Sequence, residues 1–185
     1  MGKLFEELDA RLREFIAAQQ MYFVATAPLS AEAHVNLSPK GLDTFRVVGP
    51  KQVAYLDLVG SGVETVAHLR ENGRITIMFC AFGGGPRILR LYGKGRAVEP
   101  GDDGWTDLIG LFPYHPGVRS VVFVDLERVA DSCGYGVPLF EFVGERKQLT
   151  ACAEQKGEEG MAQYKKQKNR TSIDGLPGLR SAQEE

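Results

Sequence analysis

Apolar residues recur along this chain with two different periods. Between Lys3 and Gln20 they return every three or four residues while charged residues fill the opposite face, which predicts an amphipathic helix. Farther on, short apolar or alternating runs are separated by Gly, Pro and Asn, as is typical of strands joined by tight turns. The predicted strands are Met21–Ala27, His34–Ser38, Thr44–Val48, Gln52–Val59, Arg74–Phe82, Arg87–Glu99 and Val118–Val129, with Leu139–Val143 as a further candidate.

The clearest helix start lies in the middle of the chain. Ser61 and Glu64 have the S-x-x-E spacing of a capping box, in which each side chain accepts a hydrogen bond from the other residue's backbone N–H. The helix it opens ends at Asn72-Gly73. Further helices are expected at Asp103–Phe112 and within Glu145–Lys168, followed by a polar tail with an ordered patch near Ile173–Pro177.

The order of these elements predicts a β-rich α+β fold. Mostly antiparallel strands with short turns fit a split β-barrel with flanking helices better than a parallel βαβ sheet. The length suits one domain. We expect the barrel to span residues 1–145, including the N-terminal helix at 3–20, and residues 146–185 to form a C-terminal helix and tail that pack on the barrel or on a partner chain.

Composition and charge exclude several partners. The chain has 185 residues and a net charge of -2 at pH 7, with basic and acidic residues intermixed, so no basic patch for nucleic acid is expected. No apolar stretch approaches the roughly 20 residues of a membrane helix, and the charged start differs from a secretory signal. We therefore expect a soluble, cytoplasmic protein with neither a membrane nor a nucleic-acid partner.

The common catalytic motifs are missing from the sequence. It has no G-x-S-x-G, no P-loop, no H-E-x-x-H and no G-x-G-x-x-G before a helix. The cysteines form no C-x-x-C pair and the histidines lack metal-ligand spacing, so no metal site is expected. These residues are Cys80, Cys133, Cys152, His34, His68 and His115.

Two polar segments are candidates for ligand binding. In the first, Asn36, Ser38 and Lys40 occupy alternate positions, so an amide, a hydroxyl and an ammonium group can converge on one anion. A solvated polar hairpin explains this pattern equally well. The second is Asp57–Thr65, where a strand runs through Gly60-Ser61-Gly62 into a helix whose start offers free N–H groups to a phosphate. The alternative there is that Ser61 and Glu64 only cap the helix.

At these two segments the chain resembles a known family. The stretches VATA, HVNLSPKGLDTFRV, VAYLDLVGSGVETVAHLRENGRITIMFCAF and RILRLYGKGR, in this order, are similar to the pyridoxamine 5′-phosphate oxidase-like FMN-binding split barrels. The resemblance covers roughly residues 20–145. The later stretches SCGYGVPLFEFVGER and NRTSIDGLPGL are similar to a subgroup of predicted flavin-nucleotide-binding proteins.

The resemblance implies a homodimer with two FMN molecules in the clefts between its chains. It implies contacts with the flavin ring or ribityl chain from Asn36, Leu37 and Ser38. Contacts with the phosphate are implied for Ser38, Lys40, Ser61, Gly62 and Thr65. Arg87 and Arg90 are further candidates for either part of the cofactor, and Cys133–Pro138 is a candidate cover from the partner chain.

The function this implies is that of an FMN-dependent oxidoreductase acting on a small molecule. Because the redox chemistry belongs to the cofactor, no catalytic side chain is assigned. The alternatives are a non-catalytic flavin carrier or sensor, a haem-binding split barrel, and an F420-dependent reductase. Pyridoxamine phosphate oxidases end in a segment with Trp, Arg and His that grips the substrate phosphate. Here the single tryptophan, Trp105, lies in mid-chain, so oxidation of vitamin B6 is not expected.

Overall fold

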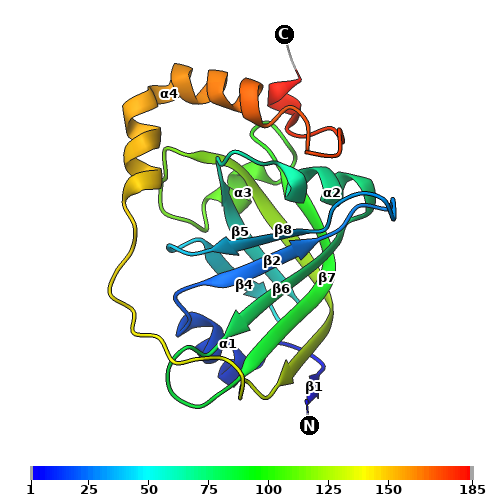
Figure 1. The fold of residues 1–185 in the computed structure, drawn as a ribbon, viewed down its shortest axis with the longest axis vertical. Helices are drawn as coiled ribbons and strands as arrows, with labels where there is room; N and C mark the ends of the chain where they lie inside the picture. Colours follow the sequence, from blue (N-terminus) through cyan, green and yellow to red (C-terminus); the bar gives the residue numbers. More distant parts are fainter. Residues whose placement is uncertain (1, 184–185) are drawn as a thin grey trace.

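The computed structural model describes residues 2–183 and centres on one curved, antiparallel sheet (Figure 1). Eight strands follow the order β3-β2-β6-β7-β8-β5-β4, with β1 paired to β8. The end strands β3 and β4 do not pair with each other, so the barrel is not closed. The strands are β1 (Leu4–Phe5), β2 (Tyr22–Thr26), β3 (Asn36–Lys40), β4 (Phe45–Gly49), β5 (Gln52–Leu58), β6 (Arg74–Cys80), β7 (Ile88–Val98) and β8 (Val118–Ser132).

Four α-helices flank the sheet. Helix α1 lies at one end of the barrel, and α4 crosses the other end together with the C-terminal segment (Figure 1). Helix α4 is kinked at Gly157, whose φ of 63° is a left-handed conformation that glycine adopts without strain. The helices are α1 (Ala10–Ala17), α2 (Glu64–Asn72), α3 (Trp105–Ile109) and α4 (Gln148–Lys168), followed by a 3-10 turn at Arg180–Ala182. None of the helices within residues 2–183 is long and apolar enough to cross a bilayer.

The core fills the inside of the curved sheet. Alternate residues of β6 and β7 face it, as the period of two predicts: Ile77, Leu89 and Leu91 are fully buried. An aromatic group closes one part of this core, with the Tyr22 and Phe45 rings 5.1 Å apart at an edge-to-face angle of 62°. Both the antiparallel order and the central place of β6 agree with the sequence-based prediction.

The helix predicted from Lys3 to Gln20 is wrong in its first half. Leu4 and Phe5 form strand β1 against β8, and the helix begins only after Asp9. The Asp9 carboxylate accepts a hydrogen bond of 2.8 Å from the N–H of Leu12, which caps the helix. Leu4 and Phe5 fit the helical period as well as they fit a strand. They form a strand because they pair with the edge of β8.

Two other boundaries also differ from the prediction. Strand β3 runs from Asn36 to Lys40, two residues later than expected, and it includes Pro39. An edge strand tolerates proline because the missing N–H faces no partner strand. Residues Leu139–Val143 form no strand; they belong to an extended linker between β8 and α4, residues 133–147, called the arm below. The large apolar side chains of Leu139–Val143 are exposed, and these residues pair with no strand of the sheet.

The position of β6 in the core gives a first prediction. Ile77→Ala should lower the free energy of unfolding by about 2–5 kcal/mol, because the buried side chain leaves a cavity. Thr76→Ala, on the other face of the same strand, should cost much less. Urea unfolding of both variants measures the difference. Equal losses would show that the inner face of β6 is assigned incorrectly.

Candidate functional site

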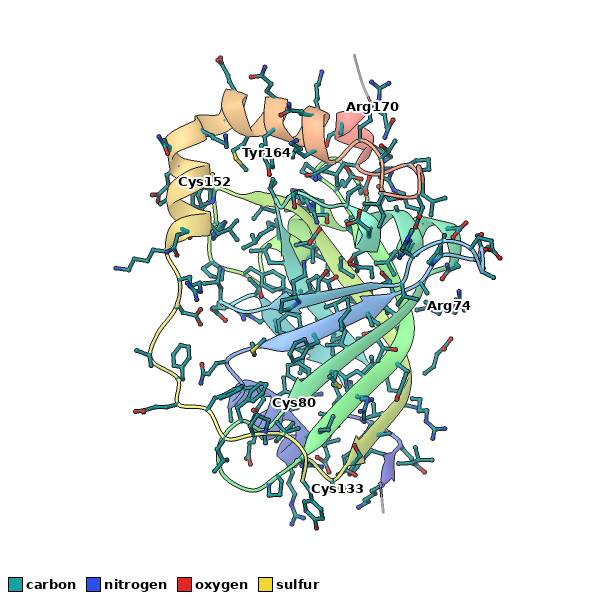
Figure 2. All side chains as sticks on the ribbon, in the orientation of Figure 1. Arg74, Cys80, Cys133, Cys152, Tyr164 and Arg170 are labelled. Atoms are coloured by element: carbon teal, nitrogen blue, oxygen red, sulfur yellow. The ribbon has the colours of Figure 1, made fainter. Side chains whose placement is uncertain are left out.

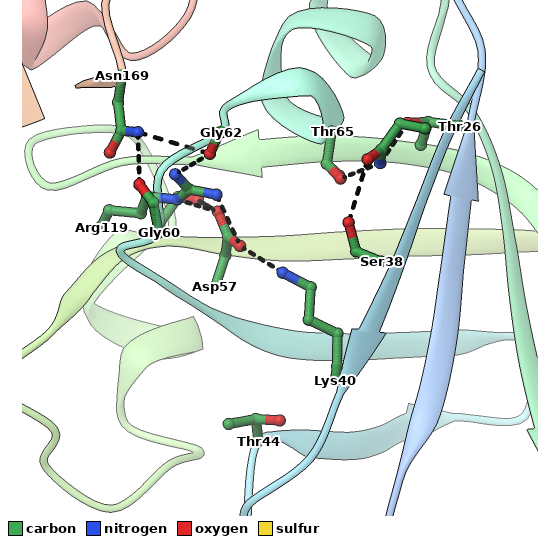
Figure 3. Close-up of polar contacts among 12 residues, drawn as sticks. Thr26, Ser38, Lys40, Thr44, Asp57, Gly60, Gly62, Thr65, Arg119 and Asn169 are labelled. Atoms are coloured by element: carbon green, nitrogen blue, oxygen red, sulfur yellow. Dashed lines mark hydrogen bonds and ion pairs between the residues drawn. The ribbon is translucent and has the colours of Figure 1, made fainter. Parts of the chain in front are cut away.

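A polar network links β3 to the first turn of α2. The Asn36 amide donates to the Thr65 hydroxyl at 3.0 Å and to the Thr26 hydroxyl at 3.2 Å. The Ser38 hydroxyl donates to the Asn36 side-chain oxygen at 3.1 Å (Figure 3). Because alternate residues of a strand share one face, Asn36, Ser38 and Lys40 all lie on the same side of β3. The structure therefore joins Asn36 and Ser38 to Thr65 by hydrogen bonds, whereas Lys40, on the same face of β3, pairs with Asp57.

The network continues to a buried histidine. The Thr26 hydroxyl lies 3.0 Å from Nδ1 of His68, whose side chain is inaccessible to solvent. Burial lowers the pKa of His68, which favours the neutral imidazole. Its Nε2 has no hydrogen-bond partner among the described residues. His68 thus supports the network from inside the fold.

Beside this network lies a fully buried carboxylate, Asp57 on β5. It pairs with Arg119 on β8, with 2.7 Å between Oδ2 and Nε, and with Lys40 on β3, with 3.2 Å between Oδ1 and Nζ (Figure 3). The Ser120 hydroxyl donates to it at 3.1 Å. Burial acts to raise the pKa of Asp57, but the cations of Arg119 and Lys40 outweigh burial and lower it from 3.8 to about 2.

This cluster carries more positive than negative charge. Two cations share the single carboxylate of Asp57, and the side chain of Lys40 is 20% exposed. The hydroxyl of Tyr55 is buried without a hydrogen-bond partner in residues 2–183, and Lys40 Nζ lies 5.8 Å from the centre of its ring. Lys40 is thus the second cation on Asp57, and the carboxylate of Glu64 at the start of α2 also interacts with Arg119.

The start of α2 is not capped in the way that the sequence predicted. Val63 is the N-cap residue and makes no side-chain hydrogen bond, and Ser61 lies two residues before it, in an exposed loop. Glu64 instead accepts a hydrogen bond of 3.2 Å from the N–H of Ile173 in the C-terminal segment. The capping box fails because its serine stands at the wrong helix position. Its failure leaves the first N–H groups of α2 without a capping side chain from the described part of the chain.

Two hollows lie at the two ends of β3. The first, about 500 Å³, is bounded by residues 34–37, by the loop before α2 and by residues 171–173. The second, about 680 Å³, lies between residues 39–42, the end of α1 and the arm, where the rings of Phe82 and Phe140 stack 5.3 Å apart. Ligand sites commonly have volumes of this order. Strand β3 therefore connects a polar hollow to a largely apolar one.

The remaining residues that the sequence analysis named as cofactor contacts divide into two groups, one at the first hollow and one at the end of β8. Ser61 and Gly62 border the first hollow, and so does Leu37, whose side chain is 63% exposed. The structure does not bring Arg87 and Arg90 to this group. They pair with the end of β8: Arg87 with Asp131 at 2.8 Å, and Arg90 with the Ser132 hydroxyl at 2.9 Å.

The cysteines and other metal-ligating residues that the structure describes form no cluster. Cys80, Cys133 and Cys152 are free, and Figure 2 places Cys133 and Cys152 near opposite ends of the molecule. Within residues 2–183 no three His, Cys, Asp or Glu side chains are arranged to hold a metal ion. The polar groups around β3 and α2 are thus the best-formed candidate site in the part of the chain that the structure describes.

Sequence reasoning gave no role in the site to Arg119 or Asn169, and it did not predict that Asp57, inside the second candidate segment, forms a buried ion pair. Asp57 and Arg119 stand as charged residues within apolar strand segments, which is a usable signal for a buried pair. Asn169 donates at 2.9 Å to the carbonyl oxygen of Gly60, although 109 residues separate the two. No local pattern in the sequence points to that contact.

The Asp57 cluster gives a prediction for acid stability. Because its pKa is lower in the folded than in the unfolded chain, ionised Asp57 stabilises the fold above about pH 4, by about 2–3 kcal/mol. This stabilisation should be lost as the pH falls from 3.8 toward 2. Asp57→Asn should unfold more easily at pH 7, by about 3–5 kcal/mol, because Arg119 stays buried without its partner.

Urea unfolding at pH 7, 4 and 3 measures both effects. The Asp57→Asn curve should depend less on pH below 4 than the wild-type curve. For Lys40→Met, which removes only one of the two cations, the pH dependence of the free energy of unfolding should lie between those of the wild type and Asp57→Asn. Asp103→Asn, at an exposed carboxylate, serves as the control. Parallel curves for wild type and Asp57→Asn would show that this carboxyl does not govern acid stability.

Comparison with known proteins places the chain in a family. A family model described as pyridoxamine 5′-phosphate oxidase matches residues 8–133. The Aspergillus flavus pyridoxamine 5′-phosphate oxidase family protein ustO is 40% identical over 200 residues, which cover 98% of this chain and 80% of the relative.

Solved structures support the fold. A variant of HupZ from group A Streptococcus has a TM-score of 0.52 at 20% identity, covering 68% of this chain and 99% of its own. A candidate pyridoxamine 5′-phosphate oxidase from Lactobacillus delbrueckii has a TM-score of 0.52 at 17% identity, covering 69% and 98%. The curved sheet is a split barrel of the same kind. On the family match over residues 8–133 and the 40% identity, this chain belongs to the pyridoxamine 5′-phosphate oxidase family.

Proposed function

We propose that this protein binds FMN along β3 and the start of α2, and that it acts as an FMN-dependent oxidoreductase on a small molecule. One observation carries the proposal: the uncapped start of α2 lies beside a cluster with two cations and one carboxylate. A phosphate needs several N–H or O–H donors together with positive charge. Both are present beside β3, where Arg119 joins the Asp57 cluster to the Gly62 carbonyl oxygen at the start of α2.

The residues around β3 and the start of α2 fit the phosphate end of FMN. The hydroxyl groups of Ser38, Ser61 and Thr65 and the ammonium group of Lys40 come from β3 and from the α2 start. The backbone N–H groups of the first turn of α2 point along the helix axis and add the positive end of its dipole. The carboxylate of Glu64 is an opposing charge at this place: it accepts a hydrogen bond from the N–H of Ile173, lies against Gly62 and borders the first hollow. Phosphate binding would require this side chain to turn away.

The second hollow fits the flavin ring. It is lined mainly by apolar side chains, among them Met21, Leu42 and Phe140, and Lys40 lies at its border with β3. A flat aromatic ring packs favourably against such a wall. A ligand with an aromatic ring at one end and a phosphate at the other would thus lie along β3.

Bound FMN would supply hydride or electron transfer. The chain's own task is to hold the phosphate, orient the ring and limit access of water, and no side chain is assigned as acid or base. The absorption spectrum of the purified protein distinguishes FMN from F420 and haem. Stopped-flow mixing of the FMN complex with NADH or NADPH then separates an oxidoreductase, which is reduced and turns over, from a flavin carrier, which does not.

We further propose that two chains associate through the arm. Its large apolar side chains are left open to solvent by residues 2–183 of one chain: Val143 is 95% exposed, Tyr135 84% and Leu139 74%. Exposed apolar groups gathered in one segment mark an interaction surface. A second copy of the chain would cover them and complete the hollow beside the arm.

The dimer is tested by sedimentation. The wild type should sediment as two chains of 20.3 kDa, since an obligate interface usually buries more than about 2,000 Å². Val143→Asp should shift the equilibrium toward the single chain because it places a charge in the arm. Tyr114→Asp, at a side chain that is 89% exposed outside the arm, is the matched control. A stable single chain at micromolar concentration would contradict the proposal.

The phosphate contact of Lys40 is tested by flavin titration. Lys40→Ala should weaken FMN by about 1.5–3 kcal/mol, the range for a hydrogen bond to a charged group, or roughly 10- to 150-fold in Kd. Riboflavin, which lacks the phosphate, should bind wild type and variant equally. Flavin fluorescence measures both affinities.

Arg90→Ala provides the control for this titration, because Arg90 pairs with Ser132 away from the site. It should leave the affinity for FMN unchanged. If Arg87→Ala or Arg90→Ala abolishes binding while Lys40→Ala has no effect, the phosphate lies on the other wall of the barrel and the proposed site is wrong.

A further inference from the structure

The carbonyl groups of the loop before α2 are held by two donors from distant parts of the chain. Asn169, at the end of α4, donates through Nδ2 to the carbonyl oxygen of Gly60 at 2.9 Å and to that of Gly62 at 3.5 Å (Figure 3). Arg119 on β8 donates through Nη1 to the oxygen of Gly62 at 2.7 Å. Both donors are buried, so the carbonyl groups point into the protein.

Peptide geometry fixes what the other side of the loop presents. In a trans peptide the C=O and the following N–H point in opposite directions. With the carbonyl groups of Gly60 and Gly62 turned inward, the N–H groups of Ser61 and Val63 point away from the two donors. Neither N–H has an acceptor among residues 2–183. Successive N–H groups on one side of a loop form a concave site for an anion.

Asn169, which donates to the Gly60 and Gly62 carbonyl oxygens, is itself fixed by buried contacts. Its side chain is inaccessible to solvent, its N–H donates to Lys165 at 2.8 Å, and its carbonyl oxygen accepts from Leu179 at 2.9 Å. Gly178 allows this close packing, since a Cβ there would overlap the Asn169 carbonyl oxygen. The side-chain oxygen of Asn169 has no hydrogen-bond partner in the described chain. Within the described chain, the side-chain amide therefore makes hydrogen bonds only through Nδ2, which donates to the loop.

Two observations independent of the helix start point to a ligand at this place. The Arg119 that fixes the carbonyl oxygen of Gly62 is also the partner of Asp57, in the cluster that has one cation in excess. The buried hydroxyl of Tyr55 in the same region has no partner within residues 2–183. Arg119 thus joins the charged cluster to the loop whose Ser61 and Val63 N–H groups would donate to an anion on its other side.

We propose that Asn169 is a positioning residue of the FMN phosphate site. It turns the carbonyl groups of Gly60 and Gly62 inward and so directs the N–H groups of Ser61 and Val63 toward the phosphate. The inference rests on the proposed FMN binding and deepens it. The family model ends at residue 133, so the C-terminal segment supplies a part of the site that lies outside the matched region.

The test is Asn169→Leu, which keeps the approximate shape of the side chain and removes its donor. The Kd for FMN, measured by flavin fluorescence, should rise roughly tenfold, while the Kd for riboflavin stays the same. Leu179→Ala is the matched control. It opens a cavity in the apolar group that holds the C-terminal segment on α2, and removes no donor. It should lower the melting temperature without changing the ratio of FMN to riboflavin affinity.

A second measurement needs no variant. Amide hydrogen exchange of the wild type, followed by NMR, should slow at Ser61 and Val63 when FMN is added and should not slow with riboflavin. It tests whether the phosphate contacts the Ser61 and Val63 N–H groups even where Asn169→Leu does not fold. Unchanged exchange at both amides in the FMN complex would overturn the inference.

The outcomes separate the two proposals. If the wild type binds FMN better than riboflavin and Asn169→Leu keeps that ratio, the inference about Asn169 is wrong and FMN binding stands. An equal change in the ratio for Leu179→Ala would also overturn it, because loosening of the segment would then suffice. If the wild type binds neither flavin, both the proposed function and this inference fall.

Discussion

The arrangement of the site depends on one buried charge, the carboxylate of Asp57. A carboxylate taken out of water must be paired, and its partners come from two different strands: Arg119 on the neighbouring β8 and Lys40 on β3. In the order of the sheet, β3 and β5 lie near opposite ends, so no backbone ladder joins them. The Asp57–Lys40 pair therefore links the two sides of the split where hydrogen-bonded strands do not.

The same pairing prepares the barrel to bind an anion. Arg119 balances Asp57 and still reaches the carbonyl oxygen of Gly62, so the ion pair and the loop before α2 form one unit. Lys40 then adds the charge that Asp57 cannot neutralise. A phosphate placed at the α2 start would compensate the charge of Lys40 and accept hydrogen bonds from the free N–H groups. Folding and cofactor binding thus draw on the same few side chains, and a change at Asp57 would affect both.

Local sequence patterns were sufficient for much of the fold and for the polar face of β3. The apolar, β-branched run located β6, the period of two located β7, and alternation along β3 correctly grouped Asn36, Ser38 and Lys40 on one face. Local patterns failed where two readings fit equally well. Leu4 and Phe5 suit a helix or a strand, and the S-x-x-E spacing at Ser61 matches a cap that the real helix start does not use. The roles of Asp57, Arg119 and Asn169 were not predicted because they come from contacts across 62 and 109 residues of chain.

A crystal structure of the protein with FMN tests the central claim most directly. We predict that the phosphate lies at the loop before α2, within hydrogen-bond distance of the N–H groups of Ser61 and Val63 and next to the ammonium group of Lys40. The flavin ring should lie along β3 toward Phe140. A phosphate bound instead by Arg87 and Arg90 at the far end of β8, with the α2 start contacting only water, would contradict it.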